Sequence, residues 1–519
     1  MKKRIFSLLL TAALTLGFVS GCSSSSDITS STEETKNSST EAVSTGETLN
    51  MATAFWYELD AHKDYNGWYS SMYGITETLF KVGDDYSTEP WIAETGTCEG
   101  NTWTIKLKDT VVFSNGNPVN SSVVIANLQR AGKMNERAAL LAAASFEEVD
   151  ETTFKITTQQ PYPTLLSDLT DPFTSIMDIE NIPEDDYNNS IIGTGPFKLE
   201  SYSAEDKIVL TKNENYWNGD VILGTVNVYY IPDSSTESMS LQSGEIDVFV
   251  GPDTDSIALF EADNSFKVTS TASTKAYYYI FNMDTMTDDA VREAIMKSVN
   301  KSDIVTLLAG SIVAAEGAYG PDTALGAVSG PSYDPEGAKK ILESAGYALN
   351  KDGFYEKDGT ELTIRIAYFA ARSIDKITTL IQDELKKSGI NTELQLYEDP
   401  DATYMETGDF DMAMYVYSTT TSGDAYSFLN ATLSATGNKN CGNYNSENVN
   451  ALLNKLVTET DSSKRVDLSL QIQQQVLDDH AVGYYAMTNK VTVSKSTVSN
   501  CNETNPLTFY FLTKDTCIG

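Results

Sequence analysis

One strand–helix–strand–strand succession in the C-terminal half of the chain constrains the fold more than any other feature. Residues 362–367 alternate between apolar and polar side chains, as a half-buried strand does. Residues 373–387 place large aliphatic side chains on one helical face, Gly389 closes this helix, and 392–396 alternates again. With a further strand over 411–417, the pattern predicts an α/β lobe with a largely parallel or mixed sheet.

The chain is long for a single hydrophobic core. Its 519 residues predict two or three lobes. Hydrophobic residues make up 41% and charged residues 21%, which predicts a folded chain and neither a disordered nor a multispan membrane protein. Further strands are predicted at 103–107 and 207–210, and helices at 121–129, 447–458 and 462–477.

The charge of the chain argues against nucleic acid as a partner. Lys and Arg number 36 against 73 Asp and Glu, which gives a formal net charge of -37. Phosphate contacts need a basic face, so a surface this acidic repels polyanions. A multi-histidine metal site or a histidine relay is hard to build, because His62 and His480 are the two histidines of the sequence.

The N-terminus has the pattern of an exported lipoprotein. A basic tripeptide at 2–4 precedes an apolar run over 5–19, which is short for a membrane span. The run ends in Val-Ser-Gly-Cys, which resembles the bacterial lipobox. This resemblance implies that residues 1–22 are a lipoprotein signal peptide and that Cys22 is lipidated. The alternatives are an ordinary signal peptide and a buried helix.

The segment that follows the leader is predicted to be a flexible tether. Residues 23–47 consist almost entirely of Ser, Thr, Glu, Asn and Gly, and such a stretch buries too little apolar surface to offset its chain entropy. No second apolar run is long enough to cross a bilayer. We therefore expect a protein held by its lipid on the extracytoplasmic face of the cell membrane.

The cysteines do not form a recognisable motif. No two of them have Cys-x-x-Cys spacing, so neither a zinc site nor a redox motif is predicted. Thiols can oxidise outside the cytoplasm. Two candidate bridges are Cys501 with Cys517 and Cys98 with Cys441, and four free thiols are the alternative.

Motifs of common enzymes are absent from the sequence. It contains no Gly-x-Ser-x-Gly elbow, no His-Glu-x-x-His and no phosphate-binding Gly-x-x-x-x-Gly-Lys-Ser/Thr. The Gly-Thr-Gly-Pro run at 193–196 is half a dinucleotide fingerprint, and its proline lacks an N–H that a phosphate cradle would use. We interpret it as a turn between lobes. Because acids are abundant, a glycosidase-like pair of carboxylates brought together by folding stays open.

A series of short motifs, in order, resembles the family 5 extracellular solute-binding proteins of peptide and nickel ABC transporters. Each motif is weak alone, but their order and spacing are specific, and they cover nearly the whole body of the chain. They are ETLF at 77–80, PWIAE at 90–94, WTIKLKD at 103–109, VFSNGNPV at 112–119, GTGPFKL at 193–199, KNENYW at 212–217, SGEID at 243–247, VREAI at 291–295, YDPEGA at 333–338 and DFDM at 409–412.

We expect the residues of these motifs to have structural roles. Gly116 and Gly195 are expected to permit tight turns. The tryptophans Trp91, Trp103 and Trp217 are expected to be apolar anchors of the core rather than ligand stackers. The same holds for the three consecutive tyrosines at 277–279, for which we expect a buried strand.

The resemblance implies an α/β fold of the periplasmic-binding-protein-like type (type II, cluster C), with two α/β lobes and an inserted extra lobe. The first lobe would be discontinuous, the second would be the insertion, and the third would hold the strand–helix–strand–strand unit. We expect the first lobe at 48–82, 192–275 and 496–519, the second at 83–191 and the third at 276–495.

The function that the resemblance implies is capture and delivery without chemistry, so no catalytic residue and no cofactor are expected. A lipid-anchored substrate-binding component of an ABC importer would capture a small peptide or related solute between the first and third lobes. Lobes hinged by extended crossovers close when a ligand bridges them. The permease subunits would then recognise the closed form, and the binding protein is expected to be a monomer.

Three alternatives stay open at this point. One is a nickel- or metal-chelate-binding protein of the same family. The second is a surface-anchored hydrolase, which predicts convergent carboxylates in the cleft. The third is a receptor or chaperone-like lipoprotein that uses the same fold without transport.

The peptide-binding branch of the family suggests one part of a ligand site. In that branch, an Asp shortly before a Ser/Asn-Phe-Leu segment holds the α-ammonium of the cargo, and a buried carboxylate there offsets desolvation of the cation. The corresponding segment here is 421–430. Thr421 stands at the amine-binding position, and Asp424 matches a neighbouring Asp. This departure argues against an ordinary dipeptide amine site.

The nickel branch suggests another part. There a His of this loop ligates the metal, and two Arg residues hold the carboxylates of a small chelator. Tyr426 occupies the His position, Arg137 aligns with one Arg, and Asp171 stands where the other would be. A lost His and a reversed charge should weaken binding of a carboxylate-chelated metal, so we assign no metal ligands.

We therefore hypothesise that Arg137 anchors a carboxylate or polar group of the ligand, and that Asp171 or Asp424 attracts a cation. Arg137 is equally well explained as a helix-surface charge. The acid at 171 favours a cationic cargo such as an oligopeptide over an anionic chelate.

His62, as a lone His, is more readily explained as a satisfied residue than as a ligand. Aromatic side chains suit such a cleft, and the candidates are Tyr57, Trp68, Tyr73, Tyr417 and Tyr426.

Overall fold

The computed structural model describes residues 47–519 except 184 and 309. The predicted signal peptide, the lipidation site Cys22 and all of the predicted tether but its last residue lie outside the described residues. Among the described helices, none combines the length and the apolar character needed to cross a bilayer.

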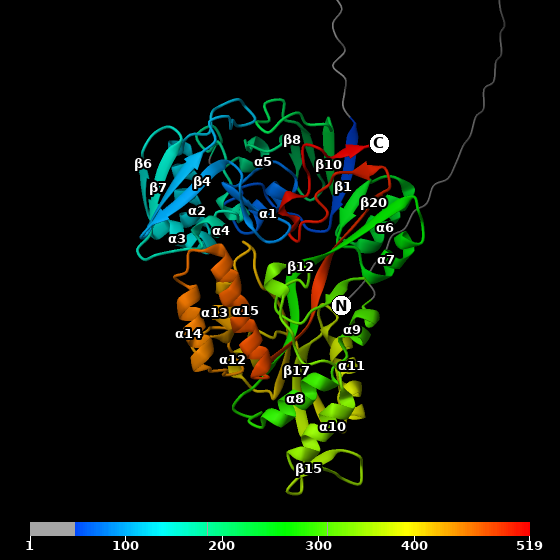
Figure 1. Cartoon of the computed structure of the whole chain (residues 1–519). Coiled ribbons are helices and arrows are strands. Elements are labelled where there is room, and N and C mark those ends of the chain that lie inside the picture. The colour runs from blue at the N-terminus through cyan, green and yellow to red at the C-terminus, as the bar shows by residue number, and fades with distance from the viewer. Residues whose placement is uncertain (1–46, 184, 309) are drawn as a thin grey trace, which may run out of the picture. The chain divides into compact units, whose positions relative to one another are not determined.

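An 11-stranded mixed sheet organises the described chain (Figure 1). Strand β1 pairs in parallel with β10 and β11, and β17 pairs in parallel with β18 and β19, whereas the other pairs are antiparallel. The strands are, in sheet order, β18 (Asn391–Tyr397), β17 (Thr363–Phe369), β19 (Met412–Ser418), β12 (Phe266–Phe281), β20 (Val482–Lys495), β11 (Val248–Val250), β1 (Thr48–Thr53), β10 (Thr225–Tyr230), β9 (Lys207–Lys212) and β8 (Phe197–Ser203), with β13 (Ile312–Ala314) also paired to β20.

Two long strands join the halves of this sheet. Strands β12 and β20 pair with each other along most of their length, and the register shifts between Ala272 and Ala276. On the side of the shift that holds residues 266–272 of β12, strand β20 pairs with β11. The sheet continues from there through β1, β10, β9 and β8, and we call these five strands the N-terminal half-sheet. Beyond the shift β12 pairs with β19, which leads to β17 and β18, and we call these three strands the C-terminal half-sheet. The family resemblance places a hinge in such a pair of extended crossovers.

The strand–helix–strand–strand prediction is confirmed. Strand β17, helix α11 (Ile374–Lys387), strand β18 and strand β19 follow one another as predicted. Helix α11 buries Ile374, Ile377, Ile381 and Leu385 completely, because these side chains share one helical face. The tyrosines at 277–279 lie buried in β12, as expected.

Helices cover the C-terminal half-sheet, with α13 to α15 to its left and α9 and α11 to its right in Figure 1. The predicted helices at 447–458 and 462–477 are confirmed as α14 (Glu447–Leu456) and α15 (Ser462–Asp478). The remaining helices and short strands of this region are α8 (Asp289–Ser298), α9 (Lys301–Leu307), η3 (Ala324–Gly326), α10 (Pro335–Ser344), α12 (Tyr404–Thr407), α13 (Tyr426–Leu433), β14 (Ala348–Leu349), β15 (Tyr355–Lys357) and β16 (Thr360–Glu361).

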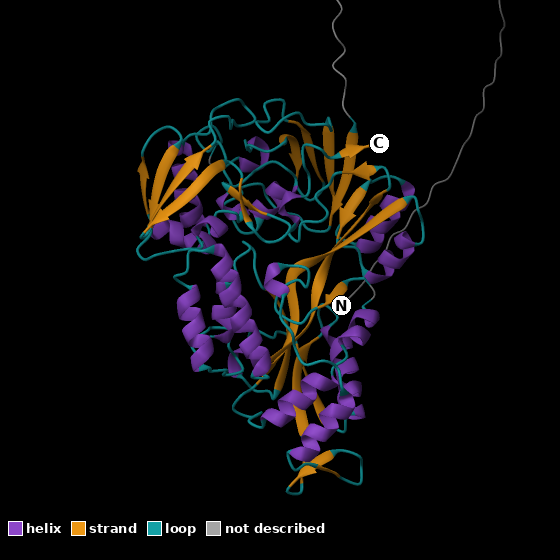
Figure 2. Ribbon diagram, viewed as in Figure 1, coloured by secondary structure: helices purple, strands orange, loops and turns teal. Residues whose placement is uncertain are grey.

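A separate four-stranded sheet has its own apolar core (Figure 2). Its strands run in the order β4-β5-β7-β6, and Asn120 begins helix α2 by accepting a hydrogen bond from the backbone N–H of Val123. The lobe boundaries stay predictions. The elements are β4 (Ala93–Glu99), β5 (Thr102–Leu107), β6 (Ser145–Glu148), β7 (Thr153–Thr157), α2 (Ser121–Met134), η1 (Glu136–Ala138) and α3 (Ala139–Ala143).

Short elements connect these sheets and carry several of the predicted site residues. They are α1 (Asn66–Met72), β2 (Phe80–Val82), β3 (Thr88–Pro90), α4 (Leu165–Asp168), η2 (Pro172–Thr174), α5 (Tyr187–Ser190), α6 (Ser234–Ser243), α7 (Thr254–Glu261), β21 (Val498–Ser499), η4 (Thr508–Tyr510) and β22 (Cys517–Ile518).

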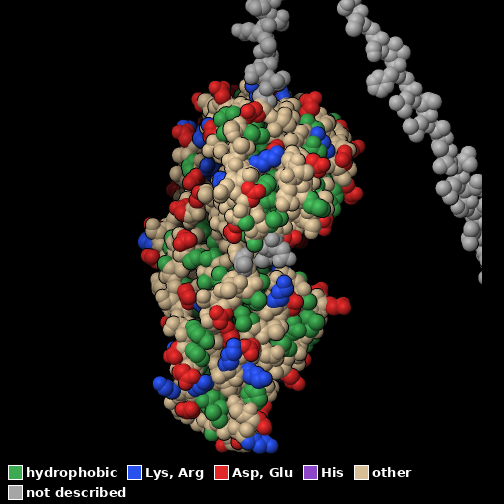
Figure 3. Space-filling view, turned by 90° about the vertical axis from the view of Figure 1, so that its right-hand side faces the viewer, with side chains coloured by type: hydrophobic (Ala, Val, Ile, Leu, Met, Phe, Trp, Pro, Cys, Tyr) green, Lys and Arg blue, Asp and Glu red, His purple; other side chains and the backbone are tan. Residues whose placement is uncertain are grey.

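Neither of the two candidate cysteine bridges is formed in the structure. Cys98, Cys441, Cys501 and Cys517 are all free thiols. Cys441 instead contacts the sulfur of Met405, with 3.4 Å between Sγ and Sδ. On the face shown in Figure 3, acidic side chains are spread widely with basic ones among them, as the net charge of -37 leads one to expect.

Candidate ligand-binding site

Trp68 joins helix α1 to the short helix η2. Its indole N–H donates to Oδ1 of Asp171 at 3.2 Å, and its ring stacks on Phe173 with the ring centroids 5.6 Å apart. Tyr65 meets the same indole edge-on at 5.0 Å. The predicted aromatic candidate Trp68 and the predicted acid Asp171 are therefore brought into direct contact.

Arg137 lies over this aromatic group. Its guanidinium carbon lies 4.6 Å from the ring centre of Tyr65, 5.3 Å from that of Trp68 and 5.0 Å from that of Phe173. The guanidinium also donates to the hydroxyl of Tyr65 at 2.7 Å. Arg137 is exposed, and its other N–H donors have no hydrogen-bond partner within the described part of the chain. The aromatic rings therefore hold the Arg137 guanidinium in place, and most of its N–H donors stay free.

Asp171 begins η2 and lies in the interior of the junction. It accepts a hydrogen bond from the backbone N–H of Phe173 at 3.3 Å, in addition to the one from Trp68. Burial raises the pKa of Asp171 to about 6, against the lowering effect of these bonds, of the Thr421 hydroxyl and of the Arg137 charge. Thr421 comes from the loop after β19, so Asp171 is a point where the predicted inserted lobe (83–191) touches the predicted third lobe (276–495).

Asp168 is a site residue that the sequence reasoning missed. It ends helix α4, and burial raises its pKa to about 7, an effect that the Asp424 and Asp171 charges reinforce and the Tyr162 hydroxyl opposes. Neither Asp168 nor Asp171 forms an ion pair with any described residue. The one sequence signal was the spacing of two acids three residues apart, which is common in so acidic a chain.

Asp424 is close to this group, but its charge is already paired. Its Oδ2 accepts hydrogen bonds from Nε and Nη2 of Arg465 at 2.8 and 2.7 Å, and its Oδ1 accepts from the backbone N–H of Tyr426. Arg465 also donates to the backbone carbonyls of Leu456 and Glu459. A carboxylate held in this way has little charge left to attract a ligand cation.

The aromatic candidates fall into two groups. Tyr57 stacks on Tyr69 at 4.1 Å and meets Tyr65 edge-on, which places it beside the Arg137 group. Tyr73 is 2% exposed and lies in the core beneath. Tyr417 stacks on Phe428, and Tyr426 begins α13, so these two belong to the C-terminal half-sheet and its helices.

Two basic side chains at the edge of the C-terminal half-sheet were also missed. Lys275 lies in β12 opposite Ser418 of β19, and Arg372 follows β17, where its backbone oxygen accepts a hydrogen bond from the Tyr277 hydroxyl. Lys275 reaches solvent in part, but burial and the Arg372 charge still lower its pKa. Neither side chain forms an ion pair within the described residues.

His62 is buried and satisfied, as its lone occurrence suggested. The carbonyl of Ser175 can only accept, so Nε2 of His62 carries the proton that it donates at 2.9 Å. Nδ1 then accepts from Arg130, which forms an ion pair with Asp60 at 2.7 Å. Burial lowers the pKa of His62 to about 4. Among the described residues, no group of three or more His, Cys, Asp or Glu side chains is placed to hold a metal ion.

Glu77 explains why several of the sequence motifs occur together. Its Oε1 accepts hydrogen bonds from the Trp91 indole and the Tyr216 hydroxyl, at 2.9 and 2.8 Å. Its Oε2 accepts from the Thr194 hydroxyl and the Trp217 indole, both at 2.9 Å. Four motifs thus meet on one buried carboxylate, which agrees with a structural role for Trp91 and Trp217.

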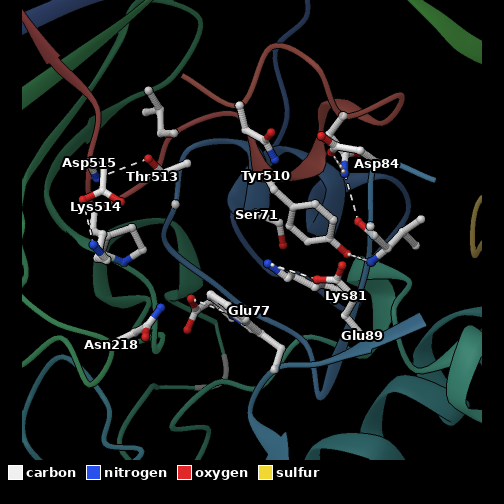
Figure 4. Close-up of a pocket in the computed structure, with 18 of the residues that line it drawn as sticks. Ser71, Glu77, Lys81, Asp84, Glu89, Asn218, Tyr510, Thr513, Lys514 and Asp515 are labelled. Carbon is white, nitrogen blue, oxygen red and sulfur yellow. Dashed lines mark hydrogen bonds and ion pairs between the residues drawn. The ribbon is translucent and has the colours of Figure 1, made fainter. Parts of the chain in front are cut away.

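A cavity of about 590 Å³ borders Glu77, and most of the charges that line it already have partners (Figure 4). Among its lining residues, Lys81 pairs with Glu89, and Lys514 pairs with Asp515. Asp84 accepts hydrogen bonds from Thr504 and Asn505. By contrast, Asp168 and Asp171 are buried acids without an ion pair that lie where Thr421 approaches from the loop after β19, and we place the candidate site there.

Two half-sheets joined by paired crossover strands, with charged and aromatic groups where the halves meet, define a bilobed binding protein. Residues 87–440 match the model of the bacterial extracellular solute-binding proteins, family 5 (middle region), and the chain belongs to this family.

Individual relatives agree with this assignment. The nickel-binding protein NikA of Staphylococcus aureus is 25% identical over 430 residues, which cover 82% of this chain and 86% of the relative. The structure described as a nickel ABC transporter from Bacillus halodurans has a TM-score of 0.83 at 28% identity, over 90% of this chain and 99% of that one. The murein tripeptide-binding protein MppA, in its unliganded open form, has a TM-score of 0.81 at 18% identity, over 91% and 97%, and shows the fold alone.

The family determines the class of function. The chain is the substrate-binding component of an ABC importer and not an enzyme, because the family and these relatives are solute-binding proteins. The surface-hydrolase alternative is therefore not supported. The predicted α/β fold of the periplasmic-binding-protein-like type is confirmed.

Proposed function

We propose that the chain binds a small cationic peptide or related solute where Asp171 meets Thr421, and delivers it to the permease subunits of an ABC importer. One observation carries the proposal. Asp168 and Asp171 are acids of raised pKa without an ion pair, and they face a loop from the other half of the molecule.

A ligand cation suits these two acids for an electrostatic reason. Each carboxylate has lost much of its hydration, and a cation placed beside it restores part of the lost stabilisation. Asp424 is less suited, because Arg465 already neutralises it. Asp171 with Asp168 is therefore our preferred cation subsite.

An anionic end of the same solute has two possible anchors. Arg137 is exposed above the aromatic rings, with most of its donors free. Arg372 and Lys275 form a second basic pair, and Arg372 lies two residues before helix α11, whose N-terminal end adds positive potential. A peptide carries both an ammonium and a carboxylate, so it can contact both kinds of subsite.

A nickel chelate is the second candidate, because two of the relatives are described as nickel proteins. Against it, Tyr426 stands at the metal-ligating His position. His62 is enclosed, and His480 hydrogen-bonds to Asp289 at 3.0 Å. We therefore rank the peptide first.

Isothermal titration of the purified chain with tri-alanine, tri-lysine and a nickel–histidine complex tests the proposal. We expect tri-lysine to bind, and Asp171→Asn to weaken it about tenfold, since the change removes about 1.4 kcal/mol of charge interaction. Asp352→Asn, on an exposed turn, is the charge-matched control and should bind as the wild type does. Tight binding of the nickel complex with no heat from either peptide would refute the peptide assignment.

The membrane attachment is also part of the proposal. The leader and its Cys22 support a monomer held by a lipid on the extracytoplasmic face of the cell membrane. Cys22→Ala should move the protein from the membrane fraction to the soluble fraction, as fractionation of cells would measure. A variant that stays in the membrane fraction would contradict the lipid anchor.

A further inference from the structure

The loop after β19 touches the turn between β2 and β3 with no side chain in between. Gly423 has a φ of +79°, and a Cβ placed on it would overlap the backbone carbonyl oxygen of Tyr86. The nearest side-chain atom is Cγ1 of Val82, at 3.7 Å. Tyr86 itself has a φ of +69°. Two left-handed residues from different parts of the chain therefore meet backbone to backbone.

The Tyr86 side of this contact is held firmly. Tyr86 is 5% exposed and packs in one apolar cluster with Val82, Leu507 and Phe509, against which Trp68 also lies. The carbonyl that faces Gly423 is therefore fixed relative to Trp68, and Trp68 donates to Asp171.

The Gly423 side is held as firmly. The backbone N–H of Thr419 donates to the carbonyl of Thr274 at 2.7 Å, which fixes the start of the loop to β12. Asp424, at its end, is tied to Arg465 at 2.7 Å. Because both sides are anchored, the loop has little freedom to absorb a change in their separation.

We propose that Gly423 is a positioning residue of the binding site, whose missing side chain lets the 419–424 loop rest on Tyr86 and so sets the distance between Thr421 and Asp171. The inference rests on the proposed function in that Asp171 and Thr421 are taken as ligand-binding groups. A Cβ at this position would force the two segments apart by roughly 1 Å before normal contact distances return. A shift of that size breaks the contact between Thr421 and Asp171.

The competing explanation is that the position needs glycine only for its left-handed backbone. Gly353 separates the two explanations, because it has a φ of +86° and no atom within 4 Å of an added Cβ. Gly353→Ala therefore introduces the same backbone strain without a clash. Gly423→Asn is the complementary variant, since Asn tolerates the left-handed conformation but carries a Cβ.

A ligand-free test uses Trp68 as a reporter of Asp171. The groups that face Asp171 are the Trp68 indole, the Phe173 N–H, the hydroxyls of Thr421 and Tyr510, and the charges of Arg137 and Asp168. Fluorescence is recorded against pH, and the signal of Trp68→Phe is subtracted to remove the other four of the 5 tryptophans. Water that enters a widened junction should lower the pKa of Asp171, which burial raises to about 6 in the wild type. Loss of the Thr421 hydrogen bond would by itself raise this pKa, but burial is the largest cause of the shift, so its relief should decide the sign.

We expect the midpoint to fall by about one pH unit in Gly423→Ala and Gly423→Asn, and to stay in place in Gly353→Ala. Crystal structures of the same variants should show the Thr421–Asp171 contact broken in the first two alone. An unchanged midpoint and an intact contact in Gly423→Ala, or an equal shift in Gly353→Ala, would overturn the inference. Peptide titration of the wild type decides the proposed function separately, because these readouts need no ligand.

Discussion

At the scale of single residues, the chain keeps several acids buried, and their surroundings distinguish structure from function. Glu77 has four donors and no freedom to serve a ligand. Asp424 has an Arg partner of its own. Asp168 and Asp171 have hydrogen bonds but no ion pair, so they remain costly to ionise. Burial alone does not mark a site, and the absence of an ion pair at a junction of distant segments is the more useful sign.

Replacement of Glu77 by Gln should destabilise the protein by about 3 kcal/mol. Each carboxylate oxygen accepts from one indole N–H, so the amide nitrogen of Gln would face a donor in either orientation. The free energy of unfolding in urea measures the loss. Glu89→Gln, a surface carboxylate beside the same cavity, should stay within about 0.5 kcal/mol of the wild type. Equal stability of the two variants would contradict the structural role of Glu77.

The raised pKa values of Asp168 and Asp171 predict a pH-dependent stability. An acid whose pKa is higher in the folded state binds more protons when folded, so the free energy of unfolding falls as pH rises. Because burial raises the pKa values of Asp168 and Asp171 to about 7 and about 6, against an ordinary 3.8, this loss should develop between about pH 4 and pH 7.

The double variant Asp168→Asn with Asp171→Asn removes both titrations. The difference in free energy of unfolding between this variant and the wild type should grow in favour of the variant by about 1 kcal/mol or more from pH 4.5 to pH 7.5, and then level off. Urea unfolding of both proteins at each pH measures this difference. Glu237 and Glu384 also have raised pKa values, of about 8 and about 7, but both proteins carry them and their effect cancels. A difference that does not vary with pH would contradict the prediction.

At the scale of elements, close backbone contacts connect segments that are distant in sequence. Gly195 was expected to permit a tight turn, and residues 194–196 do form a bend. The φ of Gly195 is not in the left-handed region, however, and an added Cβ would overlap the carbonyl oxygen of Gly74. Glycine is therefore needed here because the bend packs closely against the backbone that follows α1. Gly116, with a φ of +88°, does occupy a turn as expected.

Gly195→Ala should cost about 2 to 3 kcal/mol of stability, because the strand end and the α1 segment must separate to admit a methyl group. Gly100→Ala, where an added Cβ meets no atom within 4 Å, is the comparison and should cost about 1 kcal/mol from its left-handed backbone. Thermal unfolding of both variants measures the difference. Equal losses would show that the contact with Gly74 carries no cost.

At the scale of the whole molecule, the register shift between Ala272 and Ala276 separates two half-sheets that share strands β12 and β20. Two connections restrict the relative movement of the halves to a hinge-like motion. A solute that touches both sides of the junction stabilises the arrangement in which both sets of contacts exist.

Small-angle scattering should therefore show a smaller radius of gyration when a binding peptide is added, and no change with a peptide that titration shows not to bind. The compaction should be absent at low peptide concentration and saturate with the binding curve. A radius that is constant while titration reports full occupancy would contradict hinge closure.

Much of the architecture could be predicted from sequence because it depends on short-range periodicity. The order of β17, α11, β18 and β19, and the buried face of α11, follow from alternation and helical spacing within a few residues. The motif series placed the chain in its family, because the motifs must converge on groups such as Glu77 whatever the ligand is.

The candidate site could be predicted only in part. Trp68, Arg137, Asp171 and Thr421 were named from the sequence and lie together in the structure. Asp168, Lys275 and Arg372 were missed, because an isolated charge in a chain with 73 acids and 36 bases carries no local signal.

The sequence by itself determined the class of protein, the main elements and the residues of their buried faces, since these depend on patterns between neighbours along the chain. Only the tertiary structure decided which acids keep a free charge. Asp424 finds its partner 41 residues away in Arg465, while Asp171 meets Thr421 from the loop after β19 and forms no ion pair. Desolvation and charge pairing depend on groups that folding brings together from distant positions, and no local pattern records them.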